Sequence, residues 1–542
     1  MGSNREKSPL KSAPATNASY TNESSASVLQ SKASQSQGRV QHAAKNIFFG
    51  QVGNLITQIL GFVLRTIFIS HLGDTLNGIN TLYTSILSVL SMAELGVGTA
   101  LNYSLYKPVA EGNIEKVKSY MRLYRKAYMV IGTVIAVIGL AISPFLRYLV
   151  KQPESVTVRD LTLYYFIFLF NTVSTYFVAY KYSLCNAEQK NYIQTNVITI
   201  TKMITVSLQI IVILTTGNFY AYLLTAATVE LLQKIFVSNY LNSRYPYLKD
   251  KDVTPLTKEE TGDIVTKTKA LVLHRVGDVA RLQTDSMIIS GFINVTLCGI
   301  VDNYTMVMNS VANVVNIFFN SVISSFGNLI ATENKEKQYD LFKVYRFAAN
   351  WIYGFATIGF MLLLSPLIQI WLGSDHVLSG VVVYCVLIDF YFKGERIVLS
   401  NFKTAAGVFE QDKYLAIIQG IVNLIISIAL VTKIGLVGVY IGTIVSGLIA
   451  NITKPIIIYK DILDKPVKEY FIDSVKFIGA MVLAYLLNRG IQVLLMPQIT
   501  IVGFIVMFLV ITIVFNGIFL ALFGRCEEFR YLLRIVKDKL RK

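Results

Sequence analysis

Apolar stretches of about 20 residues, separated by short polar segments, make up most of the chain from residue 43 onward. A helix of about 20 apolar residues is long enough to cross the hydrocarbon core of a bilayer. The pattern therefore predicts an all-α integral membrane protein with about fourteen transmembrane helices. Their approximate limits are 45–69, 79–104, 127–148, 161–180, 193–215, 219–240, 270–292, 296–326, 346–372, 377–400, 414–433, 435–458, 470–488 and 499–523.

The composition supports this class, because 53% of the 542 residues are hydrophobic and only 15% are charged. A soluble protein of this size could not cover so much apolar surface with so few charges. The net charge of +17 would suggest nucleic-acid binding in a soluble protein. Here Lys and Arg concentrate in the loops after even-numbered helices, apart from Arg147, Lys151 and Arg159 after the third. The charge therefore indicates topology rather than a nucleic-acid partner, and it predicts that both termini are cytoplasmic.

Residues 1–42 are polar, rich in Ser, Ala and Asn, and without periodicity, which predicts a disordered cytoplasmic tail. The tail lacks the apolar region of a cleavable signal peptide. The four cysteines are scattered, and the sequence contains neither a Gly-rich phosphate loop nor a nucleophile triad. No disulfide framework, metal site or cofactor is therefore expected, and transport driven by ATP has no support.

An internal repeat links the two halves of the chain at an offset of 221 residues. The clearest matches pair Gly78, Ile79, Tyr83 and Thr84 with Gly299, Ile300, Tyr304 and Thr305. Each copy holds six predicted helices, an even number, so both copies share one orientation. Parallel repeats of this kind place the substrate site of a transporter at the interface between them. We expect an N-terminal lobe at 43–240, a cytoplasmic linker at 241–269, a C-terminal lobe at 270–460, two extra transmembrane helices at 461–524 and a basic cytoplasmic tail at 525–542.

A polar stripe interrupts the seventh predicted helix. It consists of His274, Asp278, Arg281 and Asp285, spaced 4, 3 and 4 residues apart. This spacing puts them on one face of a helix, over about 16 Å. Each charge costs up to about 3 kcal/mol at mid-membrane, so the face must contact other helices or a water-filled cavity. The first predicted helix has the same spacing at Asn54, Gln58, Gly61 and Arg65.

Other predicted helices also carry charges, and we expect charges from both lobes to converge on one polar interior. Cations suit an anionic substrate, whereas carboxylates suit ion coupling or charge pairing. The candidate substrate-binding residues are Arg65, Lys202, Arg275, Arg281, Lys393 and Arg396. The candidate ion-coupling residues, for H⁺ or Na⁺, are Glu94, Glu230, Asp278, Asp285 and Asp389.

A purely structural role is the alternative for several of these residues. The charges of the seventh helix could neutralise one another and merely fix its rotation, as could Glu230 and Lys234. Arg65 could be an anchor that extends to the membrane surface, as could the two cations of the tenth helix. Lys202 has no partner nearby in the sequence, which favours a functional role for it.

Several stretches resemble one family. They are "LGFVLRTIFISHLG", "MAELGVGTALNYSLYKPVAEGN", "FKTAAGVFEQDKY" and "NLIISIALVTKIGLVGVYIGTIVSG". These stretches resemble the Wzx-type polysaccharide flippases of bacteria, and the resemblance covers the chain from about residue 43 to its end. It implies the multidrug/oligosaccharidyl-lipid/polysaccharide exporter (MOP) superfamily, with two six-helix lobes around a central cavity.

The resemblance also implies an activity and partners. The activity is transfer of an undecaprenyl-diphosphate-linked oligosaccharide from the inner to the outer leaflet of the bacterial cell membrane, by alternating access coupled to an ion gradient. The partners are this substrate, membrane lipids and other polysaccharide-assembly proteins, with the chain itself a monomer. Related lipid II flippases place an arginine of a Gly-Phe-Val-Arg pattern near the diphosphate, and Arg65 in "GFVLR", with one extra residue, is its counterpart. Their last two helices form a hydrophobic groove for a lipid tail.

Two other functions fit parts of the pattern. A cation-coupled exporter of small drugs would share the fold, but it needs fewer cations in the cavity and no groove from two extra helices. A membrane polysaccharide polymerase or ligase would need a sizeable catalytic loop on the outer side, and the outer loops here are mostly short. The sequence therefore favours a flippase over an enzyme.

Overall fold

The computed structural model describes residues 20–151, 156–250, 252–408, 411–412, 414–495 and 498–540. The side chains of residues 20–49, of most residues from 263 to 282 and of a few others lie outside this description. The described residues form helices and connecting turns without a strand, which confirms the all-α class. Within them, 11 helical segments are long and apolar enough to cross a membrane, so the chain is a multi-pass membrane protein. The count of fourteen spans stays a prediction.

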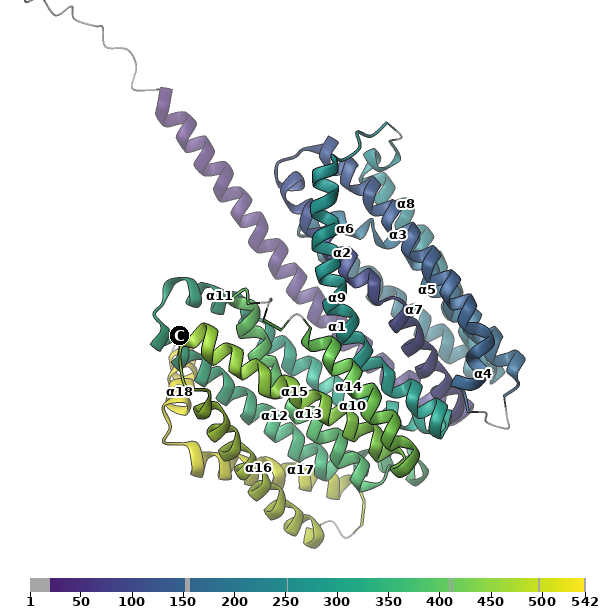
Figure 1. Ribbon diagram of the computed structural model, residues 1–542, viewed down its shortest axis with the longest axis vertical. Coiled ribbons are helices and arrows are strands. Elements are labelled where there is room, and N and C mark those ends of the chain that lie inside the picture. The colour runs from purple at the N-terminus through teal and green to yellow at the C-terminus, as the bar shows by residue number, and fades with distance from the viewer. Residues whose placement is uncertain are drawn as a thin grey trace, which may run out of the picture.

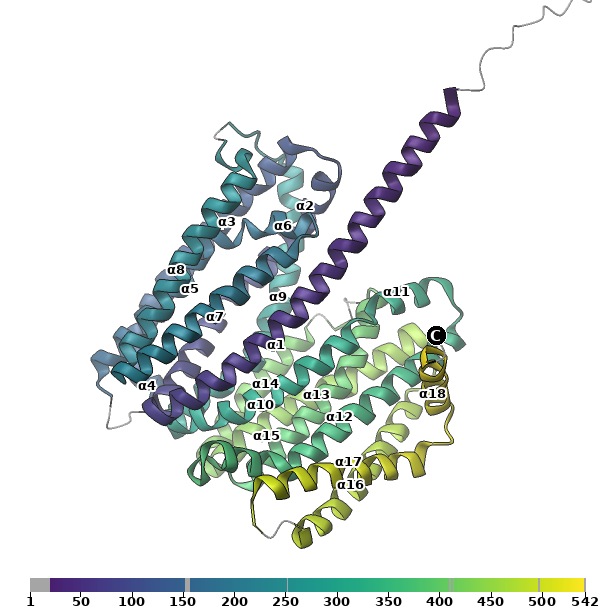
Figure 2. The same ribbon diagram turned by 180° about the vertical axis from the view of Figure 1, so that it is seen from behind.

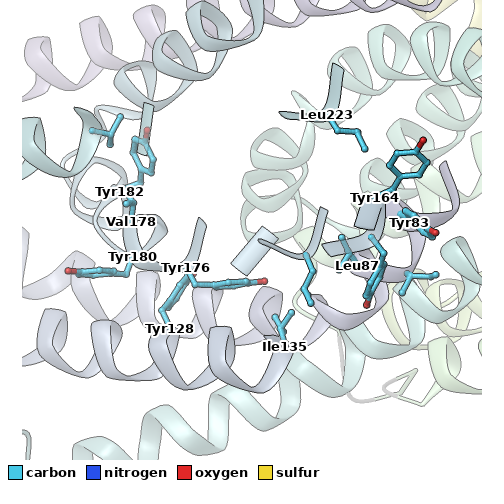
Figure 3. Packing of buried hydrophobic residues seen from close by; sticks show 14 of the residues in the cluster. Tyr83, Leu87, Tyr128, Ile135, Tyr164, Tyr176, Val178, Tyr180, Tyr182 and Leu223 are labelled. Carbon is cyan, nitrogen blue, oxygen red and sulfur yellow. The ribbon is translucent and has the colours of Figure 1, made fainter. Parts of the chain in front are cut away.

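The first lobe contains the helices up to α8 (Figure 1). These are α1 (Tyr20–Leu90), α2 (Met92–Ala110), α3 (Ile114–Ile142), α4 (Leu146–Leu149), α5 (Val158–Ala179), α6 (Tyr182–Ala187), α7 (Asn191–Thr216) and α8 (Phe219–Arg244). Its core is rich in tyrosine, including Tyr83, Tyr128, Tyr164 and Tyr176 (Figure 3). A buried hydroxyl needs a partner, and the Tyr83 hydroxyl donates to the Leu161 carbonyl at 2.8 Å.

The second lobe and the C-terminal helices follow. The bounds are α9 (Lys258–Ile288), α10 (Val295–Asn320), α11 (Ile323–Thr332), α12 (Lys335–Leu372), α13 (Gly380–Ala405), α14 (Leu415–Ile434), α15 (Leu436–Ile457), α16 (Val467–Leu495), α17 (Ile501–Phe523) and α18 (Glu527–Leu540). Helices α16, α17 and α18 pack against α12, on the side of this lobe that faces away from the first lobe (Figures 1 and 2).

The first two predicted spans meet at a sharp turn inside α1. Gly73 has φ 79° and ψ 172°, a conformation that glycine adopts at little cost. Arg65 and Asn77 hydrogen-bond to each other across this turn, although they are 12 residues apart. Twelve residues of straight helix would span about 18 Å. The chain therefore reverses at Gly73, and α1 comprises two antiparallel segments.

Several segments expected to be loops or tails are helical. Residues 20–42, predicted to be disordered, form the start of α1, and this segment contains no proline that would break a helix. The linker predicted at 241–269 contains the end of α8 and the start of α9, which begins with a capping box between Thr257 and Glu260. Within the tail predicted at 525–542, residues Glu527–Leu540 form α18. Turn and capping residues, rather than the apolar limits, set these boundaries.

The two lobes pack on each other with repeat-related contacts. Helix α1 packs against α7 of its own lobe and α10 of the other, and α9 correspondingly packs against α14 and α2. The lobes meet near the Gly73 turn and diverge toward the side where α1 begins (Figures 1 and 2). This arrangement places α1 and α9 between the two bundles.

Candidate functional site

Arg65 lies where α1 of the first lobe meets α10 of the second. Its Nη1 atom donates to Asn77 Oδ1 at 2.5 Å and to Asn303 Oδ1 at 3.2 Å. Its Nη2 atom is 2.6 Å from Asp302 Oδ2, and the two side chains are 16% and 27% exposed. An arginine at a membrane surface would extend away from the bundle, whereas Arg65 points into the interface. This geometry contradicts the anchor interpretation and makes Arg65 part of an ion pair between the lobes.

The backbones of the two lobes approach closely beside this ion pair. A Cβ atom on Gly78 would lie 1.8 Å from the Val295 carbonyl oxygen, and one on Gly299 would lie 2.8 Å from the Gly78 nitrogen. Only glycine fits such a crossing. One turn away, the Thr75 and Thr296 hydroxyls hydrogen-bond at 2.8 Å, with a sequence separation of 221 residues. Each residue therefore contacts its own counterpart in the repeat.

Further contacts close the lobes at the same end. His376 Nε2 lies 2.8 Å from Asp74 Oδ2. Trp371 Nε1 donates to Thr66 Oγ1 at 2.7 Å, and Lys151 Nζ donates to a backbone carbonyl of the second lobe at 3.1 Å. These contacts lie at the end of the molecule opposite the start of α1. Because the termini are predicted to be cytoplasmic, this end is the one predicted to face outward. The structure is thus closed at its predicted outer end.

The polar stripe of the seventh predicted helix lies on α9, between the bundles. The side chains of Arg275, Asp278 and Arg281 lie outside the described residues, so their assignments stay predictions. Asp285, the last member of the stripe, is described and partly buried. Its Oδ2 atom accepts a hydrogen bond from Thr443 Oγ1 at 2.8 Å.

Asp285 belongs to a group of oxygen atoms inside the second lobe, contributed by α9, α14 and α15. Thr443 accepts a hydrogen bond from Asn423 Nδ2 at 3.0 Å and donates to the Val439 carbonyl at 3.3 Å. Thr284 Oγ1 donates to Asn423 Oδ1 at 3.2 Å. One carboxylate, one amide, hydroxyls and a backbone carbonyl therefore gather within a few ångströms. Such a set can bind a proton or a hard cation.

The three charged candidates of α13 form one group. Asp389 is 2.7 Å from Lys393 Nζ and 3.5 Å from Arg396 Nη2. Arg396 is buried, and its Nη1 atom donates to the Gly447 carbonyl and to Asn451 Oδ1, both at 2.8 Å. Lys393 is 45% exposed. In this conformation Arg396 cross-links helices of one lobe, and its role toward substrate stays a prediction.

The remaining candidates lie inside the first lobe. Glu94 receives hydrogen bonds from the Tyr128 and Tyr176 hydroxyls, whose rings lie side by side in Figure 3. Lys202 and Glu230 share a pocket of about 300 Å³ between α5, α7 and α8. In the same pocket, Lys234 Nζ is 3.9 Å from Glu230 Oε2, as expected for the structural alternative.

The described charges therefore form separate groups, not the single polar interior that the sequence suggested. The physical reason is the cost of an unpaired charge in a medium of low dielectric constant. Each group satisfies most of its charges within one bundle. The exception is Arg65, which forms an ion pair with Asp302 of the other lobe.

An apolar pocket of about 440 Å³ lies between α12, α13 and α16, with Met361, Tyr384, Met481 and Tyr485 among its lining residues. The resemblance implies a groove formed by the last two spans. The thirteenth predicted span, α16, lines this pocket, but the other lining helices are α12 and α13. Helix α17, the fourteenth predicted span, packs against α12 and α16 and does not line the pocket.

Sequence reasoning missed several functional or structural residues. Asp302 and Asn303, which bind Arg65, were not candidates, although Asp302 is a lone acid in an apolar helix. The buried pair of Arg346 and Glu395, 3.1 Å apart, was also missed. Arg346 Nη2 also donates to the Tyr470 carbonyl at 2.8 Å and so fastens α16 to the second lobe.

The fold matches those of solved membrane transporters. The lipid II flippase MurJ, in an inward closed conformation, superposes with a TM-score of 0.64 and 13% identity, over 87% of this chain and 99% of the flippase. An inward-facing multidrug resistance MATE family transporter of the MOP superfamily gives 0.59 and 16%, over 73% and 92%. The Vibrio cholerae MATE transporter VcmN, in a mutant form, gives 0.53 and 15%, over 80% and 99%.

Sequence comparison adds nothing to this match, since no family model and no curated protein matches the chain. At these identities the likeness establishes the fold alone. That fold agrees with the two bundles and their symmetric contacts across the Gly78–Gly299 crossing. The chain is a multi-pass membrane protein whose fold is similar to those of the lipid II flippase MurJ and of a MATE family transporter of the MOP superfamily.

Proposed function

We propose that this chain is a flippase that moves an undecaprenyl-diphosphate-linked oligosaccharide from the inner to the outer leaflet of the bacterial cell membrane, for cell-surface polysaccharide synthesis. The observation that carries the proposal is Arg65. It is a permanent cation between the lobes, and in the closed state its partner is a carboxylate, Asp302. A diphosphate can take the place of that carboxylate when the lobes separate, because arginine binds both with the same fork of donors.

Arg65 then serves in two ways during alternating access. It closes the predicted outer end through Asp302, and it binds the diphosphate when that contact opens. Arg275 and Arg281, on α9 between the bundles, are the further cations that we assign to the substrate. Lys202, Lys393 and Arg396 are weaker candidates, since the groups around them lie inside single lobes.

The oxygen group around Asp285 is our candidate for ion coupling. It joins α9, which lies between the lobes, to α14 and α15. Binding H⁺ or Na⁺ there would bias the position of α9 and so the relation of the two lobes. Glu94 and Asp278 are the other carboxylates that we assign to coupling. Glu230 and Asp389 are also candidates, and each has a close cationic neighbour.

The apolar pocket beside α16 supports a lipid-linked substrate over a small drug. The MATE comparisons cover 73% and 80% of this chain, whereas the MurJ comparison covers 87%. A small-molecule exporter would not need the additional helices. A cation-coupled exporter of small drugs remains the second candidate, because two of the similar folds belong to MATE transporters.

The test is translocation by the purified full-length chain in proteoliposomes. A fluorescent undecaprenyl-diphosphate oligosaccharide in one leaflet would be followed by its accessibility to a membrane-impermeant quencher. We expect transfer that depends on the protein and is accelerated by a proton or sodium gradient. Transfer no faster than in empty liposomes, together with gradient-driven uptake of an organic cation, would overturn the flippase in favour of a drug exporter.

A further inference from the structure

A large pocket of the first lobe has no part in the proposed flipping pathway. Its volume is about 800 Å³, and it lies between α3, α5 and α8 at the end where α3 begins. These helices form the face of the first lobe that points away from the second lobe (Figures 1 and 2). The pocket is lined by five cations and one carboxylate, namely Lys118, Arg122, Arg125, Lys181, Lys249 and Asp250.

Acidic side chains do not neutralise this cluster. Lys118 alone is paired, with Glu115 at 2.6 Å and with Asp250 at 3.0 Å. Over the described residues, no carboxylate pairs with the other four cations. Arg122 donates to a backbone carbonyl at 3.2 Å instead. The pocket therefore carries an uncompensated positive charge of several units.

Lys181 shows that the cluster is built into the fold. It is only 5% exposed, and its Nζ atom donates to Ser238 Oγ at 2.7 Å and to Asn242 Oδ1 at 2.9 Å. Burial lowers the pKa of Lys181, and repulsion from the neighbouring Arg125 lowers it further. A lysine whose only role was to add positive charge to the cytoplasmic side would extend into water. A buried lysine next to an arginine is instead a position that a bound anion would stabilise.

The apolar part of the pocket indicates where the anion comes from. Met129 lies one helical turn beyond Arg125 on α3, and Phe177 faces the same pocket from α5. Their exposed fractions are 45% and 58%, so both present apolar surface to the lipid around this face. Cations at the mouth with apolar surface toward the membrane match a phospholipid, whose phosphate lies above its acyl chains.

We propose that this pocket binds the phosphate of an anionic phospholipid in the leaflet nearest the start of α3, with an acyl chain along Met129 and Phe177. Arg125, Lys181 and Lys249 supply the free positive charge. The site is separate from the interface between the lobes, and it does not depend on which substrate is flipped. A lipid held there would join α3, α5 and α8 at the surface from which α9 departs.

The experiment compares lipids retained by the full-length protein, purified in detergent with equal amounts of phosphatidylglycerol and phosphatidylcholine and weighed intact by native mass spectrometry. The test variant is Arg125→Gln with Lys249→Gln, two exposed positions. The matched control is Lys126→Gln with Lys107→Gln, which removes the same charge from exposed positions outside the pocket. Lys181→Met is a further variant that keeps the length of the side chain.

We expect the unaltered protein and the control to retain phosphatidylglycerol over phosphatidylcholine. The test variant should retain less phosphatidylglycerol, by about fivefold for each charge removed, which is the effect expected of one cation near an anionic lipid. Equal retention by the test variant and the control would overturn the proposal. So would binding of soluble pyrophosphate that Arg125→Gln abolishes, in a protein that shows no preference for phosphatidylglycerol, because the pocket would then take a free phosphate.

Discussion

Helices α1 and α9 occupy equivalent places in the two lobes, but their polar stripes end in opposite charges. Arg65 and Asp285 are each the last member of a stripe spaced 4, 3 and 4 residues apart. Arg65 reaches across to Asp302 of the other lobe, whereas Asp285 bonds to Thr443 within its own lobe. The difference teaches that the two stripes end in different environments, one at the contact between the lobes and the other inside a lobe.

The surroundings of the two residues support this division. Arg65 lies beside the glycine crossing, where any separation of the lobes must break its contact with Asp302. Asp285 instead accepts from Thr443, which also bonds to Asn423, and both of these residues belong to the second lobe. Four predictions can break or sharpen the comparison.

The largest effect should come from fixing the lobes together. Thr75→Cys with Thr296→Cys, in a chain whose four natural cysteines are replaced by alanine, places two thiols where the hydroxyls are now 2.8 Å apart. Oxidation should stop translocation in proteoliposomes, and a reductant should restore it, because transport requires this end to open. Each single-cysteine variant is the control. Full transport in the crosslinked protein would show that transport does not require this end to open.

Next, Arg65→Ala should weaken binding of the lipid-linked substrate by about tenfold or more, a loss of roughly 1.4 kcal/mol. Asp302→Asn is the matched variant, since it breaks the same ion pair but keeps the cation. Binding measured with a fluorescent substrate in detergent should survive Asp302→Asn. If both variants lose binding equally, Arg65 acts only through the interlobe contact.

A smaller effect is expected at the other member of the comparison. Asp285→Asn should leave substrate binding within about twofold of normal, since a neutral side chain of similar size keeps the packing. Acceleration of flipping by a proton or sodium gradient should disappear. Thr443→Val removes one hydroxyl and tests whether the neighbouring oxygens contribute to ion affinity. Weakened substrate binding in Asp285→Asn, with acceleration of flipping by the gradient intact, would reverse the roles assigned to α1 and α9.

The smallest effect should come from Lys393→Gln. Lys393 is 45% exposed, and Asp389 keeps Arg396 as a partner. Unfolding stability should change by no more than about 0.5 kcal/mol, as for most surface substitutions. Thermal unfolding and flipping rate would both be measured. A large loss of substrate binding in Lys393→Gln, with unchanged stability, would show that Lys393 belongs to the substrate site.

Periodicity along single helices was enough to predict much of this structure. The apolar runs predicted the all-helical class, and the stripe spacing placed Arg65 and Asp285 toward protein rather than lipid, as found. The repeat offset of 221 residues paired Gly78 with Gly299, and these two glycines are in contact in the structure. These features are local, or repeat locally, and so can be read from one sequence.

Partners across the fold could not be predicted in the same way. Which carboxylate meets Arg65 depends on how one bundle lies against the other, and nothing near residue 65 in the sequence indicates Asp302. Lys118, Arg122 and Arg125 lie in a stretch expected to be a basic loop, but the structure places them on α3, and the pocket that they share with Lys181 is formed only by tertiary packing. Helix boundaries were missed where Gly73 and Thr257 act through backbone geometry.

The crossing of Gly78 and Gly299 resembles the interface of a symmetric dimer, although it lies within a single chain. In such an isologous contact each patch meets its own copy, as Thr75 meets Thr296 here. Positions near the axis of symmetry therefore constrain each other, because a larger residue in either copy collides with the backbone of the other copy. Positions off the axis carry no such constraint, which is why Arg65 and Asp285 can differ in charge while the two glycines remain alike.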